Sequence, residues 1–181
     1  MLRIIHAADF HLDSAFGGLP QEKSRERRRE SRELVDRLAE LVRAEETEIV
    51  LLSGDLFDGE RVFPETLERL KAALAGMGCP VFIAPGNHDP YTAHSPYAAP
   101  DWPVNVHIFR SEAMEGIVLP DLDCVVHGAA FTAPDRLTPP LAGFTVPKDG
   151  RTHLLCVHGD VFSRSSRFFS RSAISSASLR F

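Results

Sequence analysis

The chain has 181 residues, 44% of them apolar and 25% charged, which is typical of a single globular domain of the size of an enzyme. Its formal net charge of −5 argues against a protein that coats nucleic acid by charge alone. The densest charge run, Glu22–Glu30, mixes both signs at helical spacing. It therefore predicts a solvated helix face rather than a DNA contact.

Cysteine usage and hydropathy indicate the compartment. Cys79, Cys124 and Cys156 form no CxxC pair and lie next to apolar residues, so they predict buried thiols rather than disulfides or a thiolate zinc site. The apolar stretch Met1–Ile5 is too short for a signal peptide, and no later segment approaches the length of a membrane span. We therefore expect a cytoplasmic protein without membrane contact.

The first half of the chain alternates buried strands with amphipathic helices. Apolar runs predict strands at Leu2–Ala8, Glu48–Ser53 and Val81–Ala84. Leucine and valine recur at helical spacing from about 22 to 44, and Pro64 opens a second helical pattern. This βαβαβ order predicts right-handed crossovers and a largely parallel sheet, with the functional site at the carboxyl ends of its strands.

The second half contains shorter apolar runs between Pro-rich loops. Residues 90–103 and 134–147 read as loops, and the aromatic residues of the first are expected to pack it rather than meet a substrate. Candidate strands follow at Val106–Phe109, Gly116–Leu119, Cys124–His127 and His153–Val157. The first three of these runs suggest a second sheet.

Polar residues gather where the strands of the first half end. Asp9-x-His11 follows the first strand, Gly54-Asp55-x-x-Asp58 the second, and Gly86-Asn87-His88-Asp89 the third. Each cluster alone could be a turn, because Asp and Asn favour turns after strands. Three clusters of carboxylate, amide and imidazole groups at successive strand ends instead predict a site for ions of the manganese, iron or zinc type.

The remaining histidines differ in whether we expect them to belong to the site. His158 follows the last candidate strand in a His-Gly-Asp sequence and is expected to join the site. His6, His107 and His153 lie in or beside apolar strands, where a core or edge histidine is the more common case. His94 reads as loop surface, and we place His127 outside the site.

This ordered series of Asp-x-His, Gly-Asp-x-x-Asp, Gly-Asn-His-Asp and His-Gly resembles the calcineurin-like metallophosphoesterases. The opening, Ile5 to Ser14, is similar to that of DNA repair exonucleases of the SbcD and YhaO type. The resemblance covers residues 1–162. It implies a four-layer α/β sandwich, in which two mixed β-sheets pack together between helices, here lacking its final strands.

The resemblance also implies a role for each site residue. Asp9 and His11 would hold the first of two divalent metal ions, Asp55 would bridge both, and Asn87 with His158 would hold the second. Manganese is the expected metal, with iron and zinc as alternatives. His88 would stabilise charge on the phosphate or protonate the leaving group, oriented by Asp58 or, as a second choice, by Asp89.

The resemblance stops after Phe162. The family pattern continues to a Gly-His-x-His segment that completes both metal shells, and this chain contains none. Residues 163–181 form a Ser/Arg-rich low-complexity tail, for which we favour truncation or a frameshift over a natural short form. With an imidazole missing from each shell, this form should turn over slowly.

We therefore expect a metal-dependent phosphodiesterase that acts as a DNA exonuclease or endonuclease in repair. Its expected partners are DNA and an SbcC-like coiled-coil ATPase, and homodimerisation would fit. Two alternatives stay open. The same ligands would serve a phosphatase or cyclic-nucleotide phosphodiesterase, and a metal-poor, inactive paralogue would only bind DNA or a partner.

Overall fold

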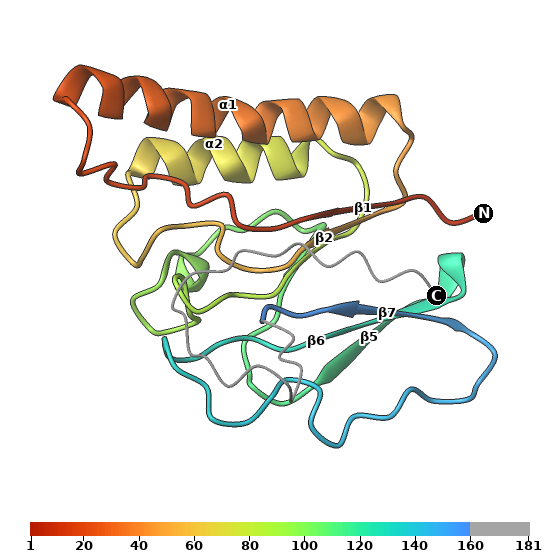
Figure 1. The fold of residues 1–181 in the computed structure, drawn as a ribbon. Helices are drawn as coiled ribbons and strands as arrows, with labels where there is room; N and C mark the ends of the chain where they lie inside the picture. The colour runs from red at the N-terminus through yellow and green to blue at the C-terminus, as the bar shows by residue number, and fades with distance from the viewer. Residues whose placement is uncertain (160–181) are drawn as a thin grey trace, which may run out of the picture.

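A computed structural model describes residues 1–159 of the chain. Figure 1 shows three layers, with a pair of helices over one sheet and a second sheet beneath it. The expected domain boundary at 162 and the tail 163–181 lie outside the described residues.

The first sheet is built from the strands of the βαβαβ pattern and one more. Its order is β1 (Ile4–Ala7), β2 (Ile49–Leu52), β3 (Val81–Ile83) and β4 (Val106–Ile108), and every neighbouring pair is parallel. All four residues of β2 and all three of β3 are buried, as expected for strands covered on both faces. Parallel strands bring their carboxyl ends to one edge, where the polar clusters then meet.

Two helices cover one face of this sheet. Helix α1 (Gln21–Ala44) and helix α2 (Pro64–Ala75) lie side by side in Figure 1, and α2 begins with a proline, whose fixed φ suits the first turn. Val35, Leu74 and Ile83 belong to the apolar cluster between helices and sheet. No helix in residues 1–159 is both long and apolar enough to cross a membrane.

The second sheet packs against the other face of the first. Strand β6 (Cys124–Gly128) pairs antiparallel with β5 (Glu115–Leu119) and parallel with β7 (Thr152–Cys156), so this sheet is mixed. Phe82, Val126 and Cys156 lie in a second apolar cluster between the sheets. Two short 3-10 helices, Pro96–Ala98 and Pro120–Leu122, lie in the connections.

The two-sheet α/β architecture is confirmed, and one strand was assigned wrongly. The run Val106–Phe109 was expected in the second sheet, but it extends the first sheet as β4. The Asn105 side-chain amide donates to the carbonyls of Leu74 and Cys79, and the Asn105 backbone carbonyl accepts from Val81 N–H at 2.9 Å. These bonds hold the chain beside β3 although no α-helix makes the crossover, and the hydropathy pattern carries no sign of them.

Candidate metal centre

The loops after β1 and β2 run side by side past the sheet edge. Asp9 N–H donates to Gly54 O at 3.1 Å and His11 N–H to Asp55 O at 3.0 Å. Leu12 pairs with Phe57 as an isolated parallel bridge, and Asp58 N–H donates to Leu12 O. These backbone bonds bring the Asp-x-His and Gly-Asp-x-x-Asp motifs together.

Left-handed backbone conformations occur at several candidate ligands. Asp9, His11 and Asp55 have φ values of 59°, 45° and 51°. Non-glycine residues adopt this region at a cost, and such residues cluster at functional sites. The strained turns aim side chains from two adjacent strands at one place.

Glycines make the close approach possible. A Cβ on Gly86 would lie 2.1 Å from Asp55 Oδ1, and one on Gly54 would lie 2.5 Å from the His158 ring. The Gly-Asp and Gly-Asn motifs therefore need glycine because the ligand side chains occupy the space of a Cβ.

Asp55 lies at the centre of the cluster. It is buried, and its Oδ1 accepts the His88 backbone N–H at 3.0 Å. Its other oxygen, Oδ2, lies 3.8 Å from His11 Nε2 and 3.5 Å from His158 Nε2. One carboxylate oxygen thus faces an imidazole on each side.

The first half of the cluster consists of Asp9, His11 and Asp55. One ligand atom from each lies within 4.8 Å of the others, the spacing at which they could share a cation. The mixture of carboxylates and imidazole suits a divalent ion of the manganese, iron or zinc type.

The second half joins Asn87 and His158 to Asp55. His158 Nδ1 lies 2.9 Å from Ser53 O, and its Nε2 lies 3.0 Å from Asn87 Oδ1. When Nδ1–H donates to Ser53 O, Nε2 presents a lone pair to Asn87 Oδ1 and Asp55 Oδ2, which are both acceptors. A cation among these three atoms would replace that repulsion with attraction, so the residues fit a bound metal ion.

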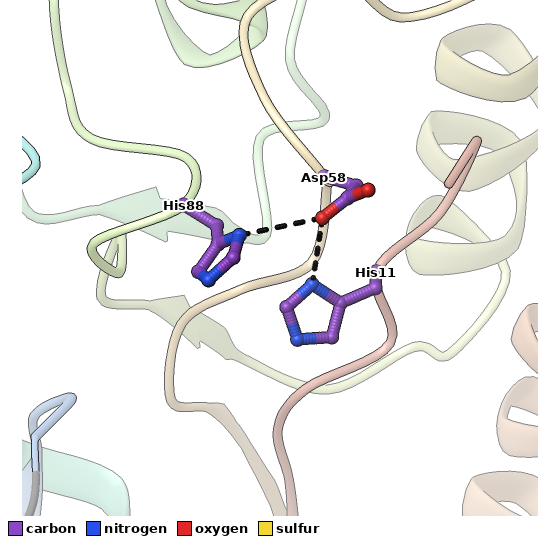
Figure 2. Close-up of side chains that lie close together, drawn as sticks. All are labelled: His11, Asp58 and His88. Atoms are coloured by element: carbon purple, nitrogen blue, oxygen red, sulfur yellow. Dashed lines mark hydrogen bonds and ion pairs between the residues drawn. The ribbon is translucent and has the colours of Figure 1, made fainter. Parts of the chain in front are cut away.

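His88 and Asp58 lie beside these ligands. Figure 2 shows Asp58 between two imidazoles, with its Oδ1 at 3.3 Å from both His11 Nδ1 and His88 Nδ1. The rings of His11 and His88 meet edge-on, with centroids 4.9 Å apart. With Nδ1 engaged, His88 can direct Nε2 towards a substrate, and its side chain is half exposed.

Asp89 has a different position from Asp58. Its side chain is fully buried and accepts the backbone N–H groups of Asp55, Phe57 and Gly86 as well as the Tyr97 hydroxyl. Burial raises the pKa of Asp89 and the hydrogen bond from Tyr97 opposes that rise, while burial raises the pKa of Tyr97 well above its ordinary value. Asp89 thus ties the loops after β2 and β3 together from inside.

The structure brings all seven expected site residues to one sheet edge. Sequence reasoning missed the groups that hold them: Ser53 O, Tyr97 and Asp13. Asp13 accepts from Arg32, Thr66 and the Phe63 backbone, so it anchors the loop after His11 to both helices. No local spacing marks Tyr97 or Asp13, whereas the position of Asp89 directly after His88 was a usable signal.

Comparison with known proteins shows which family the chain belongs to. Residues 2–174 match the family model described as calcineurin-like phosphoesterase. The chain is 33% identical over 124 residues to the uncharacterized metallophosphoesterase YhaO of Bacillus subtilis, covering 63% of this chain and 29% of that protein. It is 34% identical over 94 residues to the SbcD component of the nuclease SbcCD of Rhodobacter capsulatus, covering 49% and 22%.

A third relative is the SbcD component of the nuclease SbcCD of Bacillus subtilis, 32% identical over 96 residues. The chain spans less than a third of the length of each of these relatives. The family match, in contrast, extends over nearly the whole chain, and the loops it contains carry a donor set suited to divalent metals. The chain therefore belongs to the calcineurin-like phosphoesterases, a family of metal-dependent hydrolases, because the family model matches far more than half of it.

Proposed function

We propose that this chain forms the catalytic centre of a DNA phosphodiesterase that uses two divalent metal ions. The observation that carries the proposal is the position of Asp55 Oδ2 between His11 Nε2 and His158 Nε2. A carboxylate that faces an imidazole on each side suits a ligand shared by two cations, each of which would be held by one of the imidazoles.

Each expected residue then has a role. Asp9 and His11 would hold the first ion, Asn87 and His158 would hold the second, and Asp55 would contribute to both sites. Manganese fits the mixture of carboxylate, amide and imidazole ligands, as do iron and zinc. The Ser53 carbonyl fixes the His158 tautomer so that Nε2 is the ligand atom, a common way of orienting a metal-binding histidine.

Two ions bound by these residues would supply Lewis-acid stabilisation of the phosphate and would lower the pKa of a water nucleophile. His88 Nε2 donates a hydrogen bond to the phosphate or a proton to the leaving oxygen. Asp58 Oδ1 orients His88 through its Nδ1. Because Asp58 Oδ1 also faces His11, the position of His88, the proposed general acid, depends on that of His11, the proposed metal ligand.

The DNA substrate is proposed from the names of the relatives. Two of them are components of the nuclease SbcCD. We infer that the whole protein acts in DNA repair in the cytoplasm, with an SbcC-like coiled-coil ATPase and with homodimerisation as a further expectation.

The proposal is tested on the 181-residue chain by calorimetric titration with Mn²⁺ and by hydrolysis of bis-p-nitrophenyl phosphate and single-stranded DNA. Two ions should bind per chain, and hydrolysis should be slow but abolished by EDTA and by Asp55→Asn. Slow turnover is expected because the sequence contains no Gly-His-x-His pair. Fast turnover would contradict the need for that pair.

The same assays separate the alternatives. Preference for p-nitrophenyl phosphate or a cyclic nucleotide over DNA would support a phosphatase or a cyclic-nucleotide phosphodiesterase. A chain that binds no Mn²⁺ but retains full DNA affinity in EDTA would be an inactive binding paralogue, and the proposal would be wrong.

A further inference from the structure

The fourth strand of the first sheet brings a positively charged arginine to the edge where the metal centre lies. β4 ends at Ile108, and Arg110 follows two residues later, as Asp9 follows two residues after β1. Because the four strands are parallel, Arg110 lies at the same edge as the three ligand loops and next to the one after β3. No motif or spacing in the sequence marks Arg110 as a site residue.

The guanidinium of Arg110 lacks an internal partner among residues 1–159. Its side chain makes no hydrogen bond or ion pair there, and the residue is exposed. Its Cζ lies over the Tyr91 ring, 5.8 Å from the centroid. In contrast, the guanidinium of nearby Arg136 donates to the carbonyls of Glu112 and Thr138 at 2.6 and 2.8 Å. The positive charge of Arg110 is therefore available to a ligand.

Tyr91 connects this arginine to the metal centre. Tyr91 is the third residue after His88, and its N–H donates to Phe131 O at 2.7 Å. Phe131 in turn donates to Pro85 O, and its ring meets the His158 ring edge-on at 5.8 Å. The platform under Arg110 is thus held by the same loop and the same histidine that form the second half of the centre.

The charge pattern of the edge indicates what Arg110 would bind. The rest of the edge carries the carboxylates Asp9, Asp55 and Asp58, which repel a polyanion unless cations are present. A guanidinium is planar and weakly hydrated, and it pairs with two phosphate oxygens at once, while the aromatic ring beneath it limits its motion. A nucleic-acid strand whose scissile phosphate lies at the metal centre carries further phosphates on either side of it.

We propose that Arg110, supported by Tyr91, binds a phosphate that neighbours the scissile one in a nucleic-acid strand. This inference rests on the proposed function, because it assumes that the metal centre receives a phosphodiester. It makes Arg110 a specificity determinant for polynucleotides over small diesters, which have no second phosphate.

The test compares Arg110→Ala with Arg110→Lys in the full 181-residue chain. Arg151→Ala is the matched control, since Arg151 is also exposed and its guanidinium has no partner in the described part of the chain, but it precedes β7 and so lies away from the strand's carboxyl end. Binding of a short fluorescein-labelled oligothymidylate is measured by anisotropy over a salt series with Mn²⁺ and, in parallel, with EDTA. The Mn²⁺ series tests the inference, because the carboxylates of the edge repel a polyanion when no cation is present. Mn²⁺ titration and thermal unfolding of each variant report whether centre and fold are intact.

Arg110→Ala should weaken oligonucleotide binding roughly 3- to 10-fold and reduce the slope of log affinity against log salt by about 0.7, the value for one lost phosphate contact on a single strand. Arg110→Lys should keep the slope but recover only part of the affinity, because it retains the charge without the planar fork. Arg151→Ala should bind like the wild type.

Unchanged affinity and slope in Arg110→Ala, or an equal loss in Arg151→Ala, would overturn the inference. Loss of Mn²⁺ binding along with DNA binding would also overturn it, because Arg110 would then act on the centre itself. If the wild type hydrolyses no ester with Mn²⁺, the proposed function fails, and the affinities of Arg110→Ala and Arg151→Ala still decide whether Arg110 binds a phosphate.

Discussion

The molecule contains two groups of histidines, and they differ in whether protein atoms alone satisfy them. At the candidate metal centre, His158 Nε2 faces Asn87 Oδ1 and Asp55 Oδ2, so acceptors meet acceptors when the ring is neutral and its proton is on Nδ1. On the second sheet, His127 Nε2 lies 2.8 Å from His153 Nδ1, and His153 Nε2 lies 2.8 Å from Asp149 Oδ1. Along this row of hydrogen-bonded groups, donors and acceptors can alternate while both imidazole rings are neutral.

The pKa of His127 agrees with a neutral ring in the second group. Burial lowers the pKa of His127, and neighbouring His153 lowers it further, while the hydrogen bond from His153 lowers the pKa of Asp149. We call His127 and His153 the outer histidine pair. The outer pair needs no cation to satisfy its ring nitrogens, whereas a cation at the candidate metal centre would separate acceptors that face one another.

The largest expected effect is on metal binding. Asp55→Asn should lower Mn²⁺ affinity more than about 100-fold, beyond the range for groups that merely orient ligands, since the bridging charge is lost. His127→Gln should leave that affinity unchanged. Calorimetry on both variants checks this, and the comparison fails if the His127 variant loses Mn²⁺ as well.

Asp58 should matter to catalysis more than to folding. Asp58→Asn keeps a side chain of the same size but removes the charge facing His11 and His88, so kcat/KM for bis-p-nitrophenyl phosphate should fall about 10- to 100-fold. The urea midpoint should stay near that of the wild type because this carboxylate is partly exposed. A stability loss as large as the activity loss would make Asp58 structural instead.

Asp89 should matter to folding stability more than to catalysis. Asp89→Asn sets an amide N–H₂ against backbone donors and the Tyr97 hydroxyl, which should cost about 1–3 kcal/mol or more in the free energy of unfolding. Urea denaturation measures this cost, with Asp58→Asn as the exposed counterpart. Wild-type stability in Asp89→Asn would remove its assigned role in joining the loops.

The smallest effect concerns pH and the outer histidine pair. Since the folded-state pKa of His127 is lowered, the unfolded chain takes up the proton more readily, and stability should fall as the pH drops from about 7.5 to about 5.5. Thermal unfolding of His127→Gln should show a shallower fall. Equal slopes in the two proteins would exclude His127 as the titrating group.

The sequence by itself determined the strand–helix order of the first half and the ligand candidates at the strand ends. Short apolar runs, the helical spacing of leucines and the position of Pro64 are local signals, and parallel strands must share one carboxyl edge. The sequence also favours Asp58 over Asp89 as the carboxylate that orients His88. Asp58 Oδ1 lies 3.3 Å from His88 Nδ1, and the orienting role stays a prediction.

Only the tertiary structure decided the rest. The place of Val106–Ile108 in the first sheet depends on hydrogen bonds from Asn105 to residues more than twenty positions away. The anchors Asp13 and Tyr97, and the platform of Tyr91 under Arg110, likewise join loops distant in the chain. Local pattern reports which face of an element is apolar, whereas contacts between loops depend on how the packed sheets bring them together.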